Sequence, residues 1–230
     1  MTLFKLSLIS ISFLTMAAGC KKNTDPQPDP PKPFQLTDHF VAGTNTQKTG
    51  SKYTSVYFIQ FLEDNKALFI SSSSANLVGN YRLTEDSLLF EVTGANARTA
   101  KFALDKTKKI MSAYYKGAGP VEYESTGELL PISAGNDLAG KTFKGEEFKM
   151  GEVSNRTGLV YSFNTTGTTT YGSGTDAALI DNTLNSYTLI GGKGFKYSNG
   201  SNTELGFLSN KTLTVFRSGG LFYYGKYNQQ

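Results

Sequence analysis

The sequence predicts an all-β protein built from antiparallel strands in a meander. After residue 35, aromatic and aliphatic residues alternate with polar ones, which is typical of strands with one buried face. Pairs of Gly, Asn and Asp separate these runs, as expected for hairpin turns. Hydrophobic residues make up 38% and aromatic residues 13% of the 230 residues, which is enough for a packed core. This length allows one large β domain or two small ones.

The first 19 residues have the three parts of a secretory signal peptide. Lys5 precedes an apolar stretch from Leu6 to Met16, and the small residues Ala17-Ala18-Gly19 follow it. A membrane-spanning helix needs about 20 apolar residues, and this stretch is shorter. We therefore predict that residues 1–19 are removed.

Ala17-Ala18-Gly19-Cys20 resembles the lipobox of bacterial lipoproteins. The resemblance implies that the Cys20 thiol is lipidated, and that cleavage makes Cys20 the mature N-terminus. Several acyl chains would then hold the protein on a membrane durably. The alternative is an incidental thiol beside an ordinary secretory cleavage site. Cys20 is the single cysteine, so an internal disulfide is excluded.

Residues 20–35 combine the lipidated cysteine with a proline-rich tether. Five of the seven prolines lie between Pro26 and Pro33, a density that favours extended polyproline II structure. The tether would hold the folded part away from the bilayer, and a PxxP ligand for another domain is the alternative reading. Lipoproteins with such a tether and a lysine after the cysteine are similar to those of Bacteroidota. That similarity implies an outer-membrane location.

The strands expected after the tether follow in chain order, with turns between them. The alternating residues of the first half are Tyr53, Tyr57, Ile59 and Phe61, then Leu77, Tyr81 and Leu83, then Leu88, Phe90 and Val92. Those of the second half are Leu159, Tyr161 and Phe163, then Tyr187 and Leu189, Phe195 and Tyr197, Leu205 and Phe207, Leu213 and Val215, and Phe222 and Tyr224. The predicted turns are Glu63-Asp64-Asn65, Thr84-Glu85-Asp86, Gly191-Gly192, Asn199-Gly200 and Ser218-Gly219-Gly220.

The two halves of the folded part match each other at nearly constant offsets, with an aromatic residue (Phe40, Phe143) near each first strand. The pairs are Leu36 with Leu138 and Phe61 with Phe163 at 102, Phe90 with Phe195 and Phe102 with Phe207 at 105, and Tyr81 with Tyr187 at 106. We interpret this as an internal duplication, with β domains at 36–133 and 134–230. Regular turn spacing in a β protein is the alternative explanation.

The segment Gly79-Asn80-Tyr81-Arg82-Leu83, followed by Ser87-Leu88-Leu89-Phe90, resembles the lipocalin-like domains of bacterial lipoproteins. The resemblance implies two tandem small lipocalin-like β-barrels or sandwiches. Each half has only about 95 residues, enough for seven or eight short strands. We therefore expect barrels filled with side chains in place of open cups.

Charge and residue counts exclude several kinds of function. The net charge is +4, and removal of Lys5 with the signal peptide leaves 22 − 19 = +3, with the cations scattered. Nucleic-acid binding is therefore not predicted. One His and one Cys supply neither a structural zinc site nor a Cys-His or Ser-His pair. No cofactor, metal site or catalytic residue is predicted, and we expect a protein that is not an enzyme.

Three further features have ordinary structural interpretations. The acidic residues Glu122, Glu124 and Glu128 lack the spacing of a calcium loop and are expected on a solvated strand face. Gly191-Gly-Lys-Gly194 lacks the spacing of a phosphate loop and is expected to form a turn. His39 is expected to cap the end of a strand.

The candidate ligand-binding residues are tyrosines, because exposed rings stack on sugars and anchor protein contacts. In Tyr114-Tyr115 and Tyr223-Tyr224, alternation places one ring of each pair on the outer face. We therefore select Tyr114, Tyr123, Tyr223 and Tyr227. In the alternative reading these rings cover a barrel end or fill the interface between the halves.

These observations predict a lipid-anchored cell-envelope protein with a non-enzymatic binding role. Its partners would be the membrane, through the N-terminal lipid, and a small apolar molecule, a glycan or an envelope protein. The alternative is a periplasmic or surface inhibitor of a hydrolase such as a lysozyme or a protease. That function would need an exposed rigid loop, for which Tyr171-Gly-Ser-Gly-Thr-Asp176 is the candidate.

Overall fold

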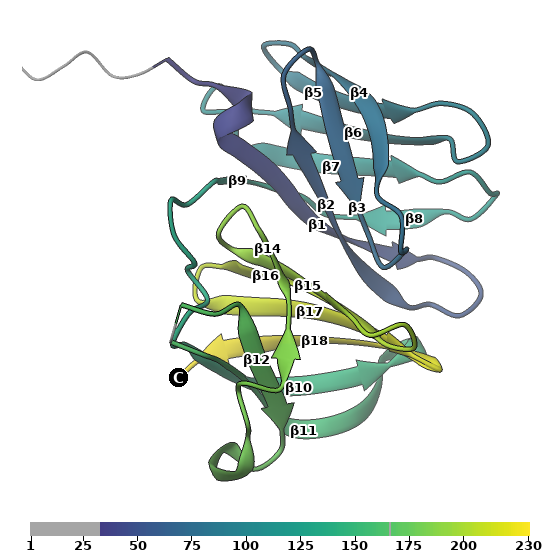
Figure 1. Ribbon diagram of the computed structural model, residues 1–230. Coiled ribbons are helices and arrows are strands. Elements are labelled where there is room, and N and C mark those ends of the chain that lie inside the picture. Colours follow the sequence, from purple (N-terminus) through teal and green to yellow (C-terminus); the bar gives the residue numbers. More distant parts are fainter. Residues whose placement is uncertain (1–32, 166) are drawn as a thin grey trace, which may run out of the picture. The chain divides into compact units, whose positions relative to one another are not determined.

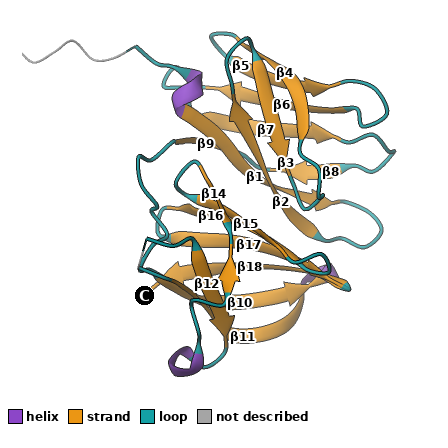
Figure 2. Ribbon diagram, viewed as in Figure 1, coloured by secondary structure: helices purple, strands orange, loops and turns teal. Residues whose placement is uncertain are grey.

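Antiparallel strands make up nearly all of the regular structure, as the alternation predicts (Figures 1 and 2). The computed structural model describes residues 33–165 and 167–230. The predicted signal peptide, Cys20 and most of the tether lie outside these residues. The helices in the described part are single 3-10 turns: η1 (Leu36–Asp38), η2 (Met150–Glu152) and η3 (Ala177–Leu179).

The first half of the folded part is a closed up-and-down barrel. Its strands are β1 (His39–Gln47), β2 (Thr54–Phe61), β3 (Lys66–Ile70), β4 (Leu77–Leu83), β5 (Ser87–Val92), β6 (Arg98–Leu104), β7 (Ile110–Lys116), β8 (Tyr123–Ser125) and β9 (Glu128–Pro131). Each strand from β1 to β7 pairs with the next in antiparallel register. The barrel closes because β1 also pairs with β8 and β9, which follow one another along its other edge. β8 and β9 thereby cover the edge of β1 that β2 leaves free, which limits pairing of that edge with another chain.

The second half repeats this topology. Its strands are β10 (Thr142–Lys149), β11 (Val153–Phe163), β12 (Thr170–Gly174), β13 (Asn185–Ser186), β14 (Thr188–Ile190), β15 (Gly194–Ser198), β16 (Thr203–Ser209), β17 (Thr212–Gly219) and β18 (Leu221–Gln229). β18 returns to pair with β10, and β13 and β14 are separated only by Tyr187. Because β13 pairs with β12 and β14 pairs with β15, this interrupted strand completes the second barrel.

Each barrel is filled with its own buried side chains, as expected for halves of this length. Leu36 and Leu138, just before the first strand of each half, both pack into the core of their own barrel. Inward residues at an offset of 102 correspond over the first two strands, in the pairs Val41 and Phe143, Tyr57 and Leu159, Ile59 and Tyr161, and Phe61 and Phe163. The matched residues Tyr81 and Tyr187 make the same contact in both barrels. The Tyr81 ring meets Phe61 edge-on with centroids 5.1 Å apart, and the Tyr187 ring meets Phe163 edge-on with centroids 5.6 Å apart. That the two barrels arose by duplication stays a prediction.

Two of the residue pairs proposed from the sequence are wrong, because one member faces into its barrel and the other faces outward. Phe102 lies inside the first barrel, whereas Phe207 faces outward from the second. Similarly, Phe143 faces inward and Phe40 faces outward. Strands β1 and β16 are buried on both faces, so an apolar residue there does not reveal which face it occupies.

A third apolar cluster joins the two barrels through their outer faces. It includes Phe40 and Phe58 from the first barrel and Leu205, Phe207 and Phe216 from the second. Phe58 meets Phe207 edge-on, with ring centroids 6.4 Å apart. A Cβ on Gly194 would lie 2.6 Å from the Phe58 ring, so only glycine permits this approach. Residues Gln35–Gln230 consequently form one compact unit.

We expect Phe58→Ala to lower the free energy of unfolding by about 3–5 kcal/mol, because it leaves a cavity in the cluster shared by both barrels. Urea denaturation followed by circular dichroism measures this change. Met111→Ala, at a residue that is 65% exposed, is the control and should change stability by less than about 0.5 kcal/mol. Equal effects of the two substitutions would contradict a joint core between the barrels.

Candidate functional site

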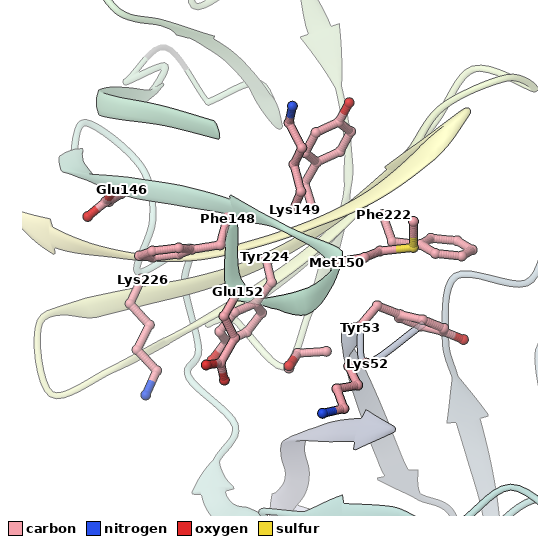
Figure 3. A pocket seen from close by; sticks show the side chains of 12 residues that line it. Lys52, Tyr53, Glu146, Phe148, Lys149, Met150, Glu152, Phe222, Tyr224 and Lys226 are labelled. Carbon is pink, nitrogen blue, oxygen red and sulfur yellow. The ribbon is translucent and has the colours of Figure 1, made fainter. Parts of the chain in front are cut away.

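A pocket of about 450 Å³ lies between the β1–β2 turn and the outer face of β10 and β18 (Figure 3). We call this pocket the groove. Its walls are lined by Lys52, Tyr53, Thr54, Glu146, Phe148, Lys149, Met150, Glu152, Phe222, Tyr223, Tyr224 and Lys226. The pairing of β10 with β18 sets Phe148 directly opposite Tyr224, and Glu146 opposite Lys226. Facing residues in neighbouring strands place their side chains next to each other, so these two pairs form adjoining parts of one wall.

Aromatic rings form most of the apolar surface of the groove. Tyr53, just before β2, stacks on Phe222 with ring centroids 4.3 Å apart. Phe216 lies 6.0 Å behind Phe222 and belongs to the cluster between the barrels, so the groove wall continues into the protein core. Burial raises the pKa of Tyr224 to about 12, which keeps its phenol neutral at physiological pH. The rings therefore offer a neutral, rigid surface.

The backbone at one end of the groove is held in unusual conformations. Lys52 and Glu152 have φ angles of 45° and 60°, in the left-handed region that disfavours residues with a Cβ. Gly151, between β10 and β11, has a φ of 74°, and its N–H donates to the Lys52 carbonyl at 3.3 Å. This bond links the turn of the first barrel to η2 of the second. Strained residues at a ligand-sized pocket are typical of functional sites.

Charged side chains surround the aromatic wall. Lys52, Lys149 and Lys226 line the groove, and within the described part of the chain no ion pair engages them. Of the two acids, Glu146 accepts a hydrogen bond from the Ser154 hydroxyl at 2.6 Å. In the view of Figure 3, the Glu152 carboxylate lies between the ammonium groups of Lys52 and Lys226. The groove thus combines an apolar wall with charges that are free to meet a ligand.

A separate polar cluster lies inside the second barrel, around Glu147. This carboxylate is only 1% exposed and accepts hydrogen bonds from Asn155 at 2.6 Å, Arg156 at 2.9 Å and Arg217 at 3.1 Å. Burial by itself would raise the pKa of Glu147, but the bond from Arg156 and the charge of Arg217 hold it below its ordinary value. Arg217 also stacks on the Tyr223 ring, 3.9 Å from its centroid. Through Arg217, the cluster therefore holds Tyr223, a residue of the groove wall, in place from inside the barrel.

A second carboxyl, Glu204, shares the interior of this barrel. Burial raises its pKa, opposed by the hydroxyls of Tyr171 and Tyr161 and by the charge of Arg217. Within the described residues, neither the Tyr171 hydroxyl nor the Glu204 Oε2 atom has a hydrogen-bond partner of normal geometry. The charge of Glu147 also raises the pKa of Glu204. These two buried carboxyls make the interior of the second barrel more polar than that of the first.

The four selected tyrosines do not form one surface. Tyr114 is 53% exposed, on the outer face of β7. Tyr123 is half-buried and meets the ring of Tyr115 edge-on at 5.2 Å. Tyr223 lines the groove. For Tyr227 the predicted surface position is wrong: it is 1% exposed and packs inside the second barrel against Tyr161 at 4.9 Å.

Other sequence interpretations can also be placed. The stretch from Tyr171 to Asp176 is not the exposed loop that an inhibitor would need, because most of it forms β12 and Tyr171 is fully buried. Gly191 and Gly192 adopt positive φ in the turn between β14 and β15, as predicted. His39 begins β1, and its Nδ1 lies 2.9 Å from the Gln35 carbonyl, which confirms its place at a strand end.

The acidic cluster lies on a solvated face, as expected. Glu122, Glu124 and Glu128 are exposed. Glu122 pairs with Lys48 at 3.7 Å, and Glu128 accepts a hydrogen bond from the Ser209 hydroxyl. Residues 33–165 and 167–230 contain no grouping of three His, Cys, Asp or Glu side chains suited to a metal ion. The same residues contain no helix long and apolar enough to cross a membrane.

Sequence reasoning missed most of the groove. Phe222 and Tyr224 are recognised as alternating strand residues, but the pattern does not show that they face outward, and Phe148 lies in a strand that shows little alternation. Tyr53 was assigned to a strand with Tyr57, but it lies just before β2 and packs against the cluster between the barrels. It and Lys52 come from a turn about a hundred residues earlier in the chain. One sequence signal for the groove was available in β18, where Phe222, Tyr224 and Lys226 share the outer face. A fully solvated face would carry polar residues, so two aromatic rings there indicate a partly covered surface.

We expect Glu147→Gln to destabilise the protein by about 1–3 kcal/mol at neutral pH, because Arg156 and Arg217 lose their counter-charge while staying partly solvated. Since folding lowers the pKa of Glu147, its stabilising effect is complete above the pKa of an unfolded Glu and is lost as the pH falls through the lower folded value. Urea denaturation at pH 7 and pH 3 should show the difference from the wild type shrinking. Exposed Glu124→Gln is the control. A difference that stays constant with pH would contradict the ion pairing.

Comparisons with known proteins give little beyond this geometry. No family model matches the chain, and no curated protein matches it. One solved structure aligns with it, a protein of unknown function from the DUF3598 family of Nostoc punctiforme, at 7% identity. The alignment covers 84% of this chain and 95% of that one, with a TM-score of 0.26.

Proposed function

We propose that this protein is a lipid-anchored, non-enzymatic binding protein of the bacterial cell envelope, and that it holds its ligand in the groove between its two barrels. The observation that carries the binding role is the aromatic groove itself. Ligand pockets of small molecules are concave, mostly apolar and supplied with a few convergent polar groups. The groove has this composition, whereas both barrel interiors are filled with their own side chains.

The construction of the groove supports binding in a preformed site. Its walls come from two barrels of paired strands, and the Tyr53–Phe222 stack rests on the core between them. Rings held in this way lose little conformational freedom when a ligand arrives. Of the expected ligand classes, a pocket of about 450 Å³ suits a small molecule or a single sugar or side chain of a larger partner.

The anchor is supported by the sequence. Ala17-Ala18-Gly19-Cys20 is similar to a lipobox, and the proline-rich segment that follows would separate the barrels from the bilayer. The compositional similarity to lipoproteins of Bacteroidota favours the outer membrane. A binding protein with filled barrels and an external groove would then face the aqueous phase beside that membrane.

Cys20→Ala should release the protein from membranes, because it removes the only thiol that lipidation can use. In a bacterial host that processes lipoproteins, the wild type should partition into the detergent phase on Triton X-114 extraction and gain the mass of acyl chains. Cys20→Ala should do neither. Detergent partitioning that persists in Cys20→Ala would contradict lipid anchoring.

Substitution of the groove wall should weaken ligand binding without unfolding the protein. We expect Phe148→Ala and Tyr224→Ala to lower affinity at least tenfold, about 1.4 kcal/mol each, because each removes a ring from the apolar wall. The measurement is ligand-detected NMR against panels of lipids, glycans and aromatic metabolites, with circular dichroism to confirm folding.

Tyr114→Ala is the matched control for these variants, since its ring is exposed on the first barrel away from the groove. Its affinity should equal that of the wild type. Absence of binding across all three panels, or equal losses in the control, would sink the proposal that the groove is the binding site.

A further inference from the structure

We infer that the groove selects a planar aromatic molecule that carries one anionic group. This inference rests on the proposed function, because it names the ligand class of the same site. Two independent features of the groove point to this class: the geometry of its rings and the balance of its charges.

The rings favour a flat ligand. Tyr53 and Phe222 stack nearly parallel, with an interplanar angle of 27°, and Phe148 faces Tyr224 across the β10–β18 pair. Met150 also lines the groove and extends its apolar wall. Aromatic rings associate best in offset-stacked or edge-on arrangements, so a wall of fixed rings favours a planar body over a flexible chain.

The charges favour an anion. The groove is lined by three lysines and two glutamates, so its balance is 3 − 2 = +1. The Glu146 carboxylate already accepts the Ser154 hydroxyl, while no ion pair in the described residues occupies the three ammonium groups. Ammonium groups at the edge of an apolar surface bind carboxylates, sulfonates and phosphates through charge-assisted hydrogen bonds.

Glu152 sets a limit on this selectivity. Glu152 lines the same groove as Lys52 and Lys226, so its negative charge opposes the approach of an anion to these lysines. A ligand with a positive group would meet Glu152 but also the lysines that line the same groove. The arrangement therefore predicts opposite effects for the two kinds of residue: loss of a lysine weakens anion binding, and loss of the Glu152 charge strengthens it.

The test uses a matched set of probes on the full chain in detergent solution. 2-Naphthoate, 2-naphthylmethanol and 2-naphthylmethylammonium share one ring system and differ in charge, and decanoate keeps the charge on a flexible chain. Isothermal titration calorimetry should show 2-naphthoate binding at least fivefold more tightly than the alcohol, and the ammonium compound most weakly. Decanoate should bind more weakly than 2-naphthoate. Raising the salt concentration should reduce the preference for the anion.

Three variants and a control locate the effect. Lys226→Gln removes the charge and keeps a polar side chain that is one atom shorter, and Lys52→Asn uses a residue that tolerates positive φ. Both should reduce 2-naphthoate affinity severalfold and leave the alcohol unchanged, whereas Glu152→Gln should raise 2-naphthoate affinity. Lys101→Gln, at an exposed position of β6 outside the groove, should change neither.

The outcomes separate the two proposals. Equal affinity for the acid and the alcohol, or tighter binding of decanoate, would overturn the aromatic-anion inference while leaving the groove as a binding site. Failure of every probe and of the wider panels to bind would overturn both. A severalfold drop in 2-naphthoate affinity in Lys226→Gln, with the alcohol unchanged, together with a gain in Glu152→Gln, would establish the inference.

Discussion

The contact between the outer faces of the two barrels is the constraint on which the rest of the structure depends. The main contact is between apolar side chains, Phe40 and Phe58 on one side and Phe207 and Phe216 on the other, and the backbone bond from Gly151 to Lys52 adds to it. The same contact brings the β1–β2 turn against β10 and β18 and thereby forms the groove. The stability of the unit and the shape of its candidate site consequently share one set of rings.

The two barrels reach similar folds with different interiors. In the first, Tyr57, Phe69 and Tyr115 stack on one another, and Arg98 lies over the Phe69 ring at 5.1 Å. In the second, an ion-paired Glu147 and a buried Glu204 replace part of that stack. Buried ion pairs add little net stability but are costly to break. The second barrel thus has less freedom to change on its inside, and the groove on its outside is built against that fixed wall.

Sequence alternation predicted the all-β class, because a period of two is a direct consequence of strand geometry. The turn residues predicted the hairpin order, and the short length of each half predicted the filled interiors. Alternation failed on face assignment at two residues: Phe207 faces out from β16, a strand buried on both faces, and Tyr227 faces into the second barrel although it was expected on the surface. It also missed the groove. Lys52 and Phe148 are brought together by the packing of two barrels, and no local pattern encodes that packing.

Apolar residues on the outer face of β1 and β2 matter before the chain is complete. As the polypeptide is made, the first barrel can close about a hundred residues before the second exists, and Phe40 and Phe58 then point toward water with nothing to cover them. Such a folding intermediate exposes an apolar patch, and nascent chains with exposed apolar surface are prone to aggregate. The apolar faces that join the mature barrels therefore promote aggregation while only the first barrel is complete. A holding chaperone would prevent this until the second barrel has formed.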